Sequence, residues 1–119
     1  MDKAKLKKHF DDALQELQNG NSSLALEYLH KIILYSKNNS KVFSLISLCY
    51  FNLKNFKEAE NFISKAIKSE PDEIGFYINK GNILKEQRKF KLAENIYNKA
   101  EEYVFDFYDV MSLIDLTGD

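Results

Sequence analysis

Apolar residues recur at intervals of three and four positions along most of the chain. Between residues 40 and 53, such intervals separate Val42, Ile46, Cys49 and Leu53. This spacing places apolar side chains on one face of an α-helix, whereas a half-buried strand would alternate at every second residue. The same pattern predicts helices over residues 3–18, 22–35, 40–52, 56–67, 72–87, 90–103 and 106–116. The sequence therefore predicts an all-α protein of about seven helices.

Short polar segments separate the predicted helices. Residues 19–21 (Asn-Gly-Asn) and 54–55 (Lys-Asn) form two of these breaks. Pro71 is expected to end the fourth helix, because proline has no amide hydrogen to donate and keeps Glu70 out of the helical conformation.

Nearly the same phrase is present twice, as FKEAENFISKA at 56–66 and FKLAENIYNKA at 90–100. Its first alanine recurs at a constant spacing, at Ala25, Ala59 and Ala93, and we call this spacing one repeat length. Fixed periods of about 20–50 residues are typical of proteins built from stacked structural repeats. We therefore expect a single domain, residues 1–119, with three antiparallel helix pairs at about 6–39, 40–73 and 74–107.

Small residues stand at fixed places in these units and predict close helix contacts. Besides the three alanines on the second helices, Ser47 and Gly81 occupy the equivalent place on two first helices. A bulky side chain there would push the helix axes beyond the distance of close packing, about 8–10 Å. Large residues are expected to fill the space alongside: Phe43, Tyr50, Phe56, Tyr77, Leu84 and Phe90.

The first unit departs from this scheme. Keeping the repeat length strictly constant would place Asp12 and Glu16 in buried positions, where a carboxylate is costly. The sequence favours a shift of one residue, with one residue lost from the first turn. The inward residues are then Phe10, Ala13, Leu14 and Leu17.

The order of large and small residues is most regular in the second and third units. In the second unit the positions are Phe43, Ile46, Ser47, Tyr50, Phe56, Ala59, Ile63, Ala66 and Pro71. In the third unit they are Tyr77, Gly81, Leu84, Phe90, Ala93, Tyr97 and Ala100. This order resembles the tetratricopeptide repeat family, and it departs from the family pattern at Lys80 and at Phe105, which replaces the closing proline. The resemblance implies a right-handed α-solenoid of antiparallel helix pairs, a superhelix that binds other proteins.

Another apolar stripe follows the third unit. It includes Phe107, Met111 and Ile114, and it predicts a C-terminal helix over about residues 106–116. Repeat proteins need a terminal element to cover the last exposed face, so this helix is expected to cap the solenoid. The alternatives are that it lies in the groove of its own chain or docks into another copy.

Charge and composition exclude several functional classes. The net charge is −1, so the chain lacks the basic excess of a nucleic-acid module. No apolar run approaches the roughly 18 residues of a membrane span. A single cysteine, Cys49, fits a reducing compartment, and we expect a cytoplasmic protein.

The sequence offers little for catalysis. Cys49 lies inside an apolar stripe, and neither His9 nor His30 stands at a spacing suited to zinc. No glycine-rich phosphate loop or nucleophile motif is present in the sequence. We therefore predict no enzymatic activity, no metal and no cofactor.

Binding of a protein or peptide partner is the predicted function, as an adaptor or scaffold. In a stack of helix pairs, the first helix of each pair lines the concave side. The residues expected to face this groove are Lys8, Asp11, Gln15, Lys41, Ser44, Leu48, Phe51, Asn52, Ile78, Asn82 and Lys85. Leu48, Phe51 and Ile78 would form an apolar strip with a polar rim, unless neighbouring side chains or the C-terminal helix cover them.

One known binding mode of the family is not expected here. Members that hold the C-terminal carboxylate of heat-shock chaperones use charge-assisted donors at fixed inward places. Four of the five corresponding residues lack the expected donor, and Asp11 would repel a carboxylate. These places are Asp11, Gln15, Leu45, Gly75 and Asn79.

Two other functions remain open at this stage. One is an assembly subunit or homodimer that associates through Phe107, Met111 and Ile114. The other is a small chaperone for a secreted or pilus-type substrate, a role that some small members of the tetratricopeptide repeat family play.

Overall fold

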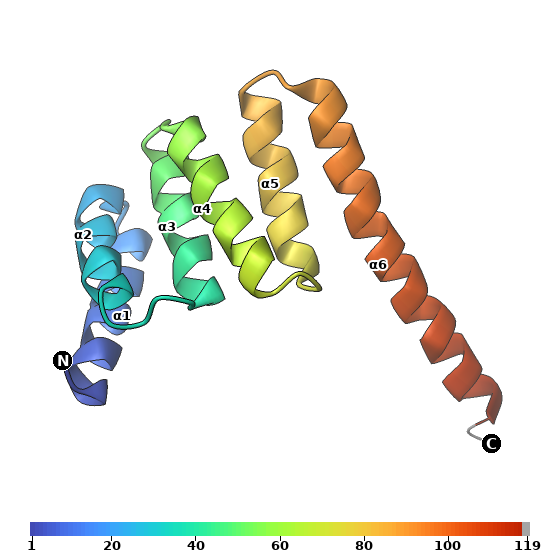
Figure 1. Ribbon diagram of the computed structural model, residues 1–119, viewed down its shortest axis with the longest axis horizontal. Coiled ribbons are helices and arrows are strands. Elements are labelled where there is room, and N and C mark those ends of the chain that lie inside the picture. The colour runs from blue at the N-terminus through green and yellow to red at the C-terminus, as the bar shows by residue number, and fades with distance from the viewer. Residues whose placement is uncertain (118–119) are drawn as a thin grey trace. The chain divides into compact units, whose positions relative to one another are not determined.

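The protein is all-α and consists of helix pairs (Figure 1). The computed structural model describes the backbone of residues 1–117 and the side chains of residues 1–103. The helices are α1 (Lys3–Gln18), α2 (Ser22–Ile33), α3 (Ser40–Asn52), α4 (Phe56–Ser69), α5 (Ile74–Glu86) and α6 (Phe90–Thr117). Two compact units contain them, Met1–Pro71 with α1 to α4 and Asp72–Asp119 with α5 and α6. The predicted fold class is confirmed.

Residues 1–117 form six helices, whereas about seven were expected. The difference is that α6 continues without a break for 28 residues. Phe105 stands one repeat length after Pro71, so the proline that closes the preceding repeat is absent and the backbone can remain helical. The predicted capping and association residues, Phe107, Met111 and Ile114, lie outside the described side chains.

Side chains and the proline set the ends of the helices. Asp2 accepts a hydrogen bond from the Lys5 amide at 2.9 Å and starts α1, and Asn39 accepts one from the Val42 amide at 3.1 Å and starts α3. At the other end, α4 stops two residues before Pro71, and Glu70 has left the helical region with φ −143° and ψ 78°. The predicted break at Pro71 is confirmed.

The turns within the three helix pairs have the same geometry. The middle residue has a positive φ in each turn: 81° at Gly20, 63° at Lys54 and 63° at Arg88. The next amide reaches back to a carbonyl of the first helix, in a Schellman arrangement. These hydrogen bonds run from Asn21 to Glu16 at 2.8 Å, from Asn55 to Tyr50 at 2.9 Å and from Lys89 to Leu84 at 2.9 Å.

The first turn therefore keeps the full repeat length. The first helices end at Gln18, Asn52 and Glu86, and each of these ends lies one repeat length after the previous one. The predicted loss of one residue from the first turn is wrong. A backbone turn of this kind needs a left-handed residue at one position, and Gly20 satisfies this need without strain.

The side chains of the first unit nevertheless face the way the sequence indicated. Ala13 is fully buried, and Phe10 and Leu17 pack against the core. Glu16 stays only partly buried, and its carboxylate accepts a hydrogen bond from Asn21 Nδ2 at 2.8 Å. A paired carboxylate at the edge of the core avoids the cost of burying a charge, so the helix does not need to shift.

The small residues allow the helices of each pair to approach closely. Ala25, Ala59 and Ala93 are buried, as predicted. Ser47 Oγ donates a hydrogen bond to the carbonyl of Ala59 at 2.7 Å, so a hydroxyl replaces packing at this contact. At Gly81, a methyl group would lie 2.6 Å from Cδ1 and 2.8 Å from Cζ of Tyr97.

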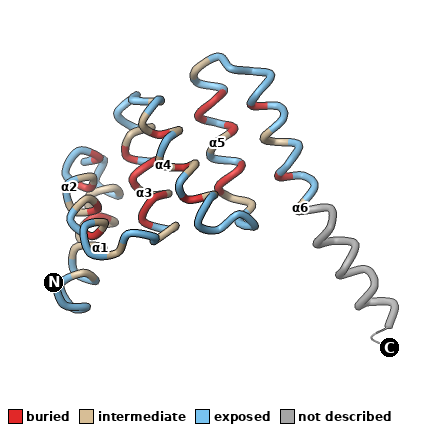
Figure 2. The backbone as a smooth tube through the Cα atoms, viewed as in Figure 1, coloured by how far each residue is buried: buried red, intermediate tan, exposed pale blue. Residues whose placement is uncertain are grey.

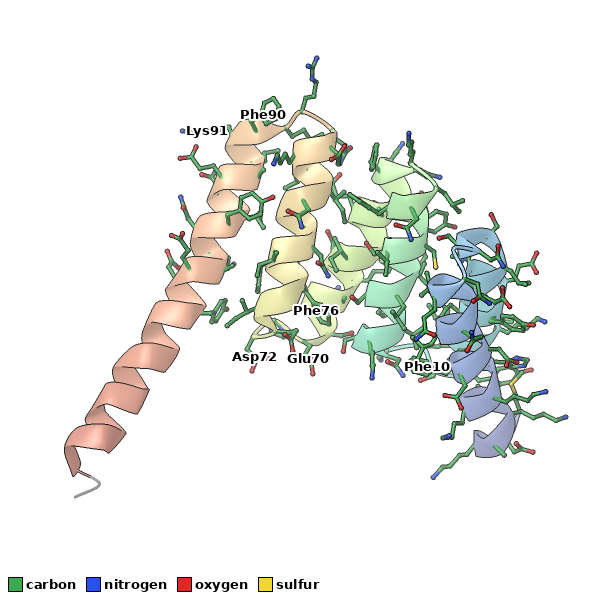
Figure 3. All side chains as sticks on the ribbon, turned by 180° about the vertical axis from the view of Figure 1, so that it is seen from behind. Phe10, Glu70, Asp72, Phe76, Phe90 and Lys91 are labelled. Carbon is green, nitrogen blue, oxygen red and sulfur yellow. The ribbon has the colours of Figure 1, made fainter. Side chains whose placement is uncertain are left out.

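The core of the first unit lies between α1, α2 and α3, and Figure 2 shows buried positions along these helices. Its buried members are Ala13, Ala25, Leu29, Ile32, Val42, Ile46 and Cys49. One expected packing residue differs: Phe90 is 60% exposed and stands at the start of α6 (Figure 3). Phe56, its counterpart in α4, packs edge-to-face on Phe51 with ring centroids 5.6 Å apart. Lys85 occupies the place of Phe51 in the third repeat, so Phe90 has no such ring to cover it.

Candidate partner-binding surface

The α3 helix carries an exposed apolar residue beside its buried stripe. Leu48 is 44% exposed, while its neighbours Ile46 and Cys49 are completely buried. Ser44 and Phe51, at helical spacing from Leu48, are partly buried, and Lys41 is exposed. These four residues, which the sequence places in the groove, therefore lie along one side of α3.

Some of the predicted groove residues are engaged in contacts within the first unit. Asn52 Nδ2 donates a hydrogen bond to Ser22 Oγ at 3.0 Å and joins the end of α3 to the start of α2. The ring of Phe51 packs against Phe56 on α4. Lys41 Nζ lies 5.3 Å from the ring centroid of Phe10, which brings α3 next to α1.

The residues predicted on α1 are exposed and make local contacts. Asp11 forms an ion pair with Lys7 at 3.2 Å, and Gln15 donates a hydrogen bond to Asn19 at 3.4 Å. Lys8 is exposed and has no ion pair within the described part of the chain. Both contacts join residues four positions apart, on α1 and its C-terminal cap, and do not involve another helix.

The observed register places three α1 residues at groove positions, although the sequence argument had assigned them to the packing between helices. The positions one repeat length before Ser44, Leu48 and Phe51 are Phe10, Leu14 and Leu17, and all three are partly buried. The missed signal was the position of Gly20, which lies one repeat length before Lys54 and marks an intact turn.

In the second unit, α5 carries the remaining predicted residues. Ile78 is 44% exposed and Lys85 is exposed. Asn82 accepts a hydrogen bond from the hydroxyl of Tyr97 at 2.6 Å, which joins α5 to α6. The equivalent positions of the two first helices in the first unit form what we call the first-helix face: Phe10, Leu14, Leu17, Ser44, Leu48 and Phe51. Their counterparts in the second unit are Ile78, Asn82 and Lys85.

The thiol of the buried cysteine has low reactivity. Cys49 is completely buried, and burial raises the pKa of its thiol to about 11. The thiol therefore stays protonated near neutral pH and is a poor nucleophile. In the described part of the chain, no group of three His, Cys, Asp or Glu side chains is placed to hold a metal ion. Nor does any helix in that part combine the length and apolar character that crossing a bilayer requires.

His30 lies among aromatic rings at the junction of α2, α3 and α4. Its ring meets Phe62 and Tyr50 edge-on, with centroids 6.0 Å and 6.4 Å away, and its Nε2 lies 3.4 Å from the Tyr50 hydroxyl. Burial lowers the pKa of His30 below its ordinary value of 6.5, because the charged imidazolium is poorly solvated there.

Acidification is expected to destabilise the protein through His30. The unfolded chain binds the proton more readily than the folded chain, so the contribution of His30 to stability is complete above pH 6.5 and falls as the pH decreases below that value. Urea unfolding of the wild type and of His30→Gln at several pH values will test this. We expect a smaller decrease in the variant; an identical decrease would assign the effect to other groups.

Two consecutive segments, residues 40–73 and 74–103, match the model of the tetratricopeptide repeat family. Together they make up more than half of the chain; the first has the bounds of the second predicted unit, and the second begins at the same residue as the third predicted unit, 74–107, and ends four residues earlier. The chain therefore belongs to the tetratricopeptide repeat family.

Individual relatives share parts of the chain. Protein O-mannosyl-transferase TMTC3 from Homo sapiens is 33% identical over 66 residues, which is 56% of this chain but 7% of that protein. Among solved structures, MamA from Desulfovibrio magneticus RS-1 has a TM-score of 0.80 at 18% identity, covering 82% of this chain and 55% of that one. The first TPR of Spaghetti (RPAP3), bound to the HSP90 peptide SRMEEVD, has a TM-score of 0.80 at 19% identity, covering 87% of this chain and 82% of that one. At these identities, the two structures establish the shared fold.

Proposed function

We propose that this protein is a non-enzymatic adaptor that holds a segment of another protein against the first-helix face. The observation that carries the proposal is the exposure of Leu48, at 44%, on a helix whose other apolar residues are mostly buried. Exposed apolar residues with a polar rim are typical of surfaces that bind a peptide or helix. Lys41 and the Lys7–Asp11 pair supply such a rim in the first unit.

The equivalent positions of the first helices become less apolar along the chain. On the first-helix face they are Phe, Leu and Leu on α1 and Ser, Leu and Phe on α3, whereas their counterparts on α5 in the second unit are Ile, Asn and Lys. An apolar anchor of the partner is therefore expected to contact the first unit. Fully covering a leucine side chain contributes about 1.5–3 kcal/mol, so a half-exposed Leu48 can supply a substantial part of a modest affinity.

The proposed partner is a segment with apolar anchors, and a chaperone tail is not expected. The peptide bound to Spaghetti, SRMEEVD, is acidic. Leu45 and Asn79 lie one repeat length apart, and the first-repeat position of the same series is Asp11, whose carboxylate would repel a second carboxylate. Leu45 and Gly75 have no side-chain hydrogen-bond donor, and Asn79 carries no charge.

Replacing Leu48 by aspartate is expected to weaken partner binding by about 2 kcal/mol or more, roughly 30-fold in Kd, because it places a charge at the apolar centre of the contact. The partner can first be trapped by a photo-crosslinking amino acid at position 48, and its affinity for both forms can then be measured by calorimetry. Leu24→Asp is the matched control, because Leu24 is 39% exposed and lies on α2, outside the first-helix face.

The outcomes of this experiment are distinct. Loss of binding in Leu48→Asp, with helicity and melting temperature unchanged, supports the proposal. Equal weakening by Leu24→Asp would contradict it, because the added charge alone would then explain the loss of binding. Unfolding of Leu48→Asp would also contradict it, because Leu48 would then belong to the core.

A second candidate function is self-association at the α6 end of the chain. Phe90 is largely exposed at the start of α6, and Leu92 is exposed nearby. Exposed apolar residues at the start of a helix favour a docking contact. Sedimentation at several concentrations distinguishes the candidates, because a dimer that dissociates in Phe90→Ser would favour this alternative.

A further inference from the structure

The second repeat has an open depression on a side of α3 away from Leu48. It has a volume of about 580 Å³ and is lined by Lys37, Asn38, Phe43, Lys65, Lys68 and Ser69. Its floor is the edge of Phe43, whose ring is otherwise buried against Phe62, with centroids 6.2 Å apart. Phe43 and Leu48 are five residues apart on one helix and therefore point to different sides. The depression is separate from the first-helix face.

The third repeat fills the equivalent place with its own side chain. Tyr77 corresponds to Phe43 and Tyr103 corresponds to Ser69, each one repeat length further along the chain. The ring of Tyr103 stacks on Tyr77, with centroids 5.5 Å apart and the planes tilted by 27°. The small Ser69 leaves this space open in the second repeat. In the third repeat, an aromatic ring therefore occupies the equivalent place beside Tyr77.

A lysine lies over an aromatic ring in both repeats, although the two rings are not equivalent: Phe62 has Ile96 as its counterpart in the third repeat. Lys99 Nζ lies 5.5 Å from the centroid of Tyr77, and its counterpart Lys65 lies 4.6 Å from the centroid of Phe62. These distances allow cation–π attraction. An aromatic ring entering the depression would therefore meet Phe43 at its edge and the ammonium group of Lys65 beside it.

Two further lysines line this depression and have no lysine counterpart in the third repeat: Lys37, just before the second repeat, and Lys68 within it. The residues one repeat length after Lys37 and Lys68 are Pro71 and Glu102. Neither lysine forms an ion pair within the described residues, and no carboxylate among those residues lines the depression. The α4 helix favours a cation at Lys68, in its last turn, but this does not account for Lys37, which lies outside any helix. The rim is positively charged although the chain as a whole has a net charge of −1.

We propose that the depression binds an aromatic side chain from an acidic segment of a partner protein. The ring occupies the place that Tyr103 fills in the third repeat, and the flanking carboxylates meet Lys37 and Lys68. Charge complementarity selects an acidic segment, and the open place over Phe43 selects an aromatic residue within it. The surface thus provides a second contact, with a chemistry different from that of the first-helix face.

The test uses a synthetic acidic peptide with a central tryptophan, Asp-Glu-Trp-Glu-Asp, blocked at both ends. The chain contains no tryptophan, so the emission of the peptide reports binding without background. We expect saturable binding that weakens with added salt. The peptide Asp-Glu-Ala-Glu-Asp should compete about tenfold or more less effectively, because it lacks the ring that anchors the contact.

Ser69→Tyr is the decisive variant. It copies the third repeat and fills the depression, so binding of the tryptophan peptide is expected to fall about tenfold or more, whereas Ser69→Ala leaves the space open and should bind as the wild type does. Lys68→Glu, which also copies the third repeat, should weaken binding more than Lys57→Glu. Lys57 is an exposed lysine on the same helix, about 16 Å from Lys68 at 1.5 Å per residue.

Several results would overturn the proposal. Equal binding by the wild type and Ser69→Tyr would exclude the depression as the site. Equal effects of Lys68→Glu and Lys57→Glu would show nonspecific attraction to positive charge. If the wild type instead self-associates and Ser69→Tyr abolishes this association, the occupant is a second copy of the chain and the proposed partner is wrong. Circular dichroism of each variant establishes that the helices are intact.

Discussion

Replacing Leu29 by alanine is expected to lower the free energy of unfolding by about 2–5 kcal/mol. Leu29 is completely buried on α2 and belongs to the core that α2 forms with α1 and α3. Truncation removes apolar contacts and leaves a cavity that fully packed neighbours such as Ile46 cannot fill without moving. Because domains of this size are stable by only about 5–15 kcal/mol, the change is a large part of the total.

Urea unfolding followed by far-ultraviolet circular dichroism measures this effect. Leu34→Ala is the matched control, since Leu34 is 71% exposed just after α2 and should change stability by no more than about 0.5 kcal/mol. Similar losses in the two variants would mean that α2 does not pack as described. A decrease confined to Leu29→Ala would show that the first unit depends on contacts between repeats.

Replacing Gly81 by valine is expected to destabilise the second unit by about 1–3 kcal/mol through overpacking. The Cβ atom alone would lie 2.6 Å from Cδ1 of Tyr97, before the two methyl groups of valine are added. Tyr97 is also held in place by its hydrogen bond to Asn82, so the ring cannot rotate away without losing that contact. The two helices must therefore separate.

Gly75→Val is the matched control for this prediction. Gly75 lies on the same helix, and its nearest neighbour would be a side-chain oxygen of Glu73 at 3.4 Å, an ordinary contact with a flexible group. Hydrogen exchange of the α5 and α6 amides should accelerate in Gly81→Val and change little in Gly75→Val. The double variant Gly81→Val, Tyr97→Leu should recover part of the loss. Equal exchange in the two glycine variants would contradict the close approach at Gly81.

The repeated packing residues leave the remaining positions free to differ between repeats. Ala25, Ala59 and Ala93 allow the same close helix contact in all three repeats. Position 69 and its counterpart 103, in contrast, carry serine and tyrosine. The proposed aromatic site depends on this difference between serine at position 69 and tyrosine at position 103. Family membership therefore accounts for the packing of the chain and does not identify its partner.

Much of the fold could be predicted from the sequence because its signals are local. The constant repeat length, the three- and four-residue intervals and Pro71 predicted both ends of the first five helices and the start of α6 to within a few residues. The order of small and large residues also predicted the contacts at Ser47 and Gly81. In each of these cases, the identity of a residue and its spacing from other residues in the sequence are enough to predict the helix or the contact.

The positions that sequence reasoning missed depend on contacts that the apolar pattern does not record. The register of the first unit depended on the left-handed turn at Gly20 and on the Asn21 side-chain amide that pairs with Glu16. The exposure of Phe90 followed from the lysine at position 85, where the preceding repeat has an aromatic ring. A pattern of apolar residues indicates which positions favour burial, but it does not indicate which neighbouring side chain covers each of them.

The sequence by itself determined that this chain is an all-α protein of helix pairs, and it determined where most helices begin and end. Only the tertiary structure decided which apolar residues remain exposed, such as Leu48, and where a missing ring leaves a depression, as at Ser69. The physical reason is that helix formation and repeat packing follow from short-range spacing, while exposure depends on every side chain that surrounds a position in space.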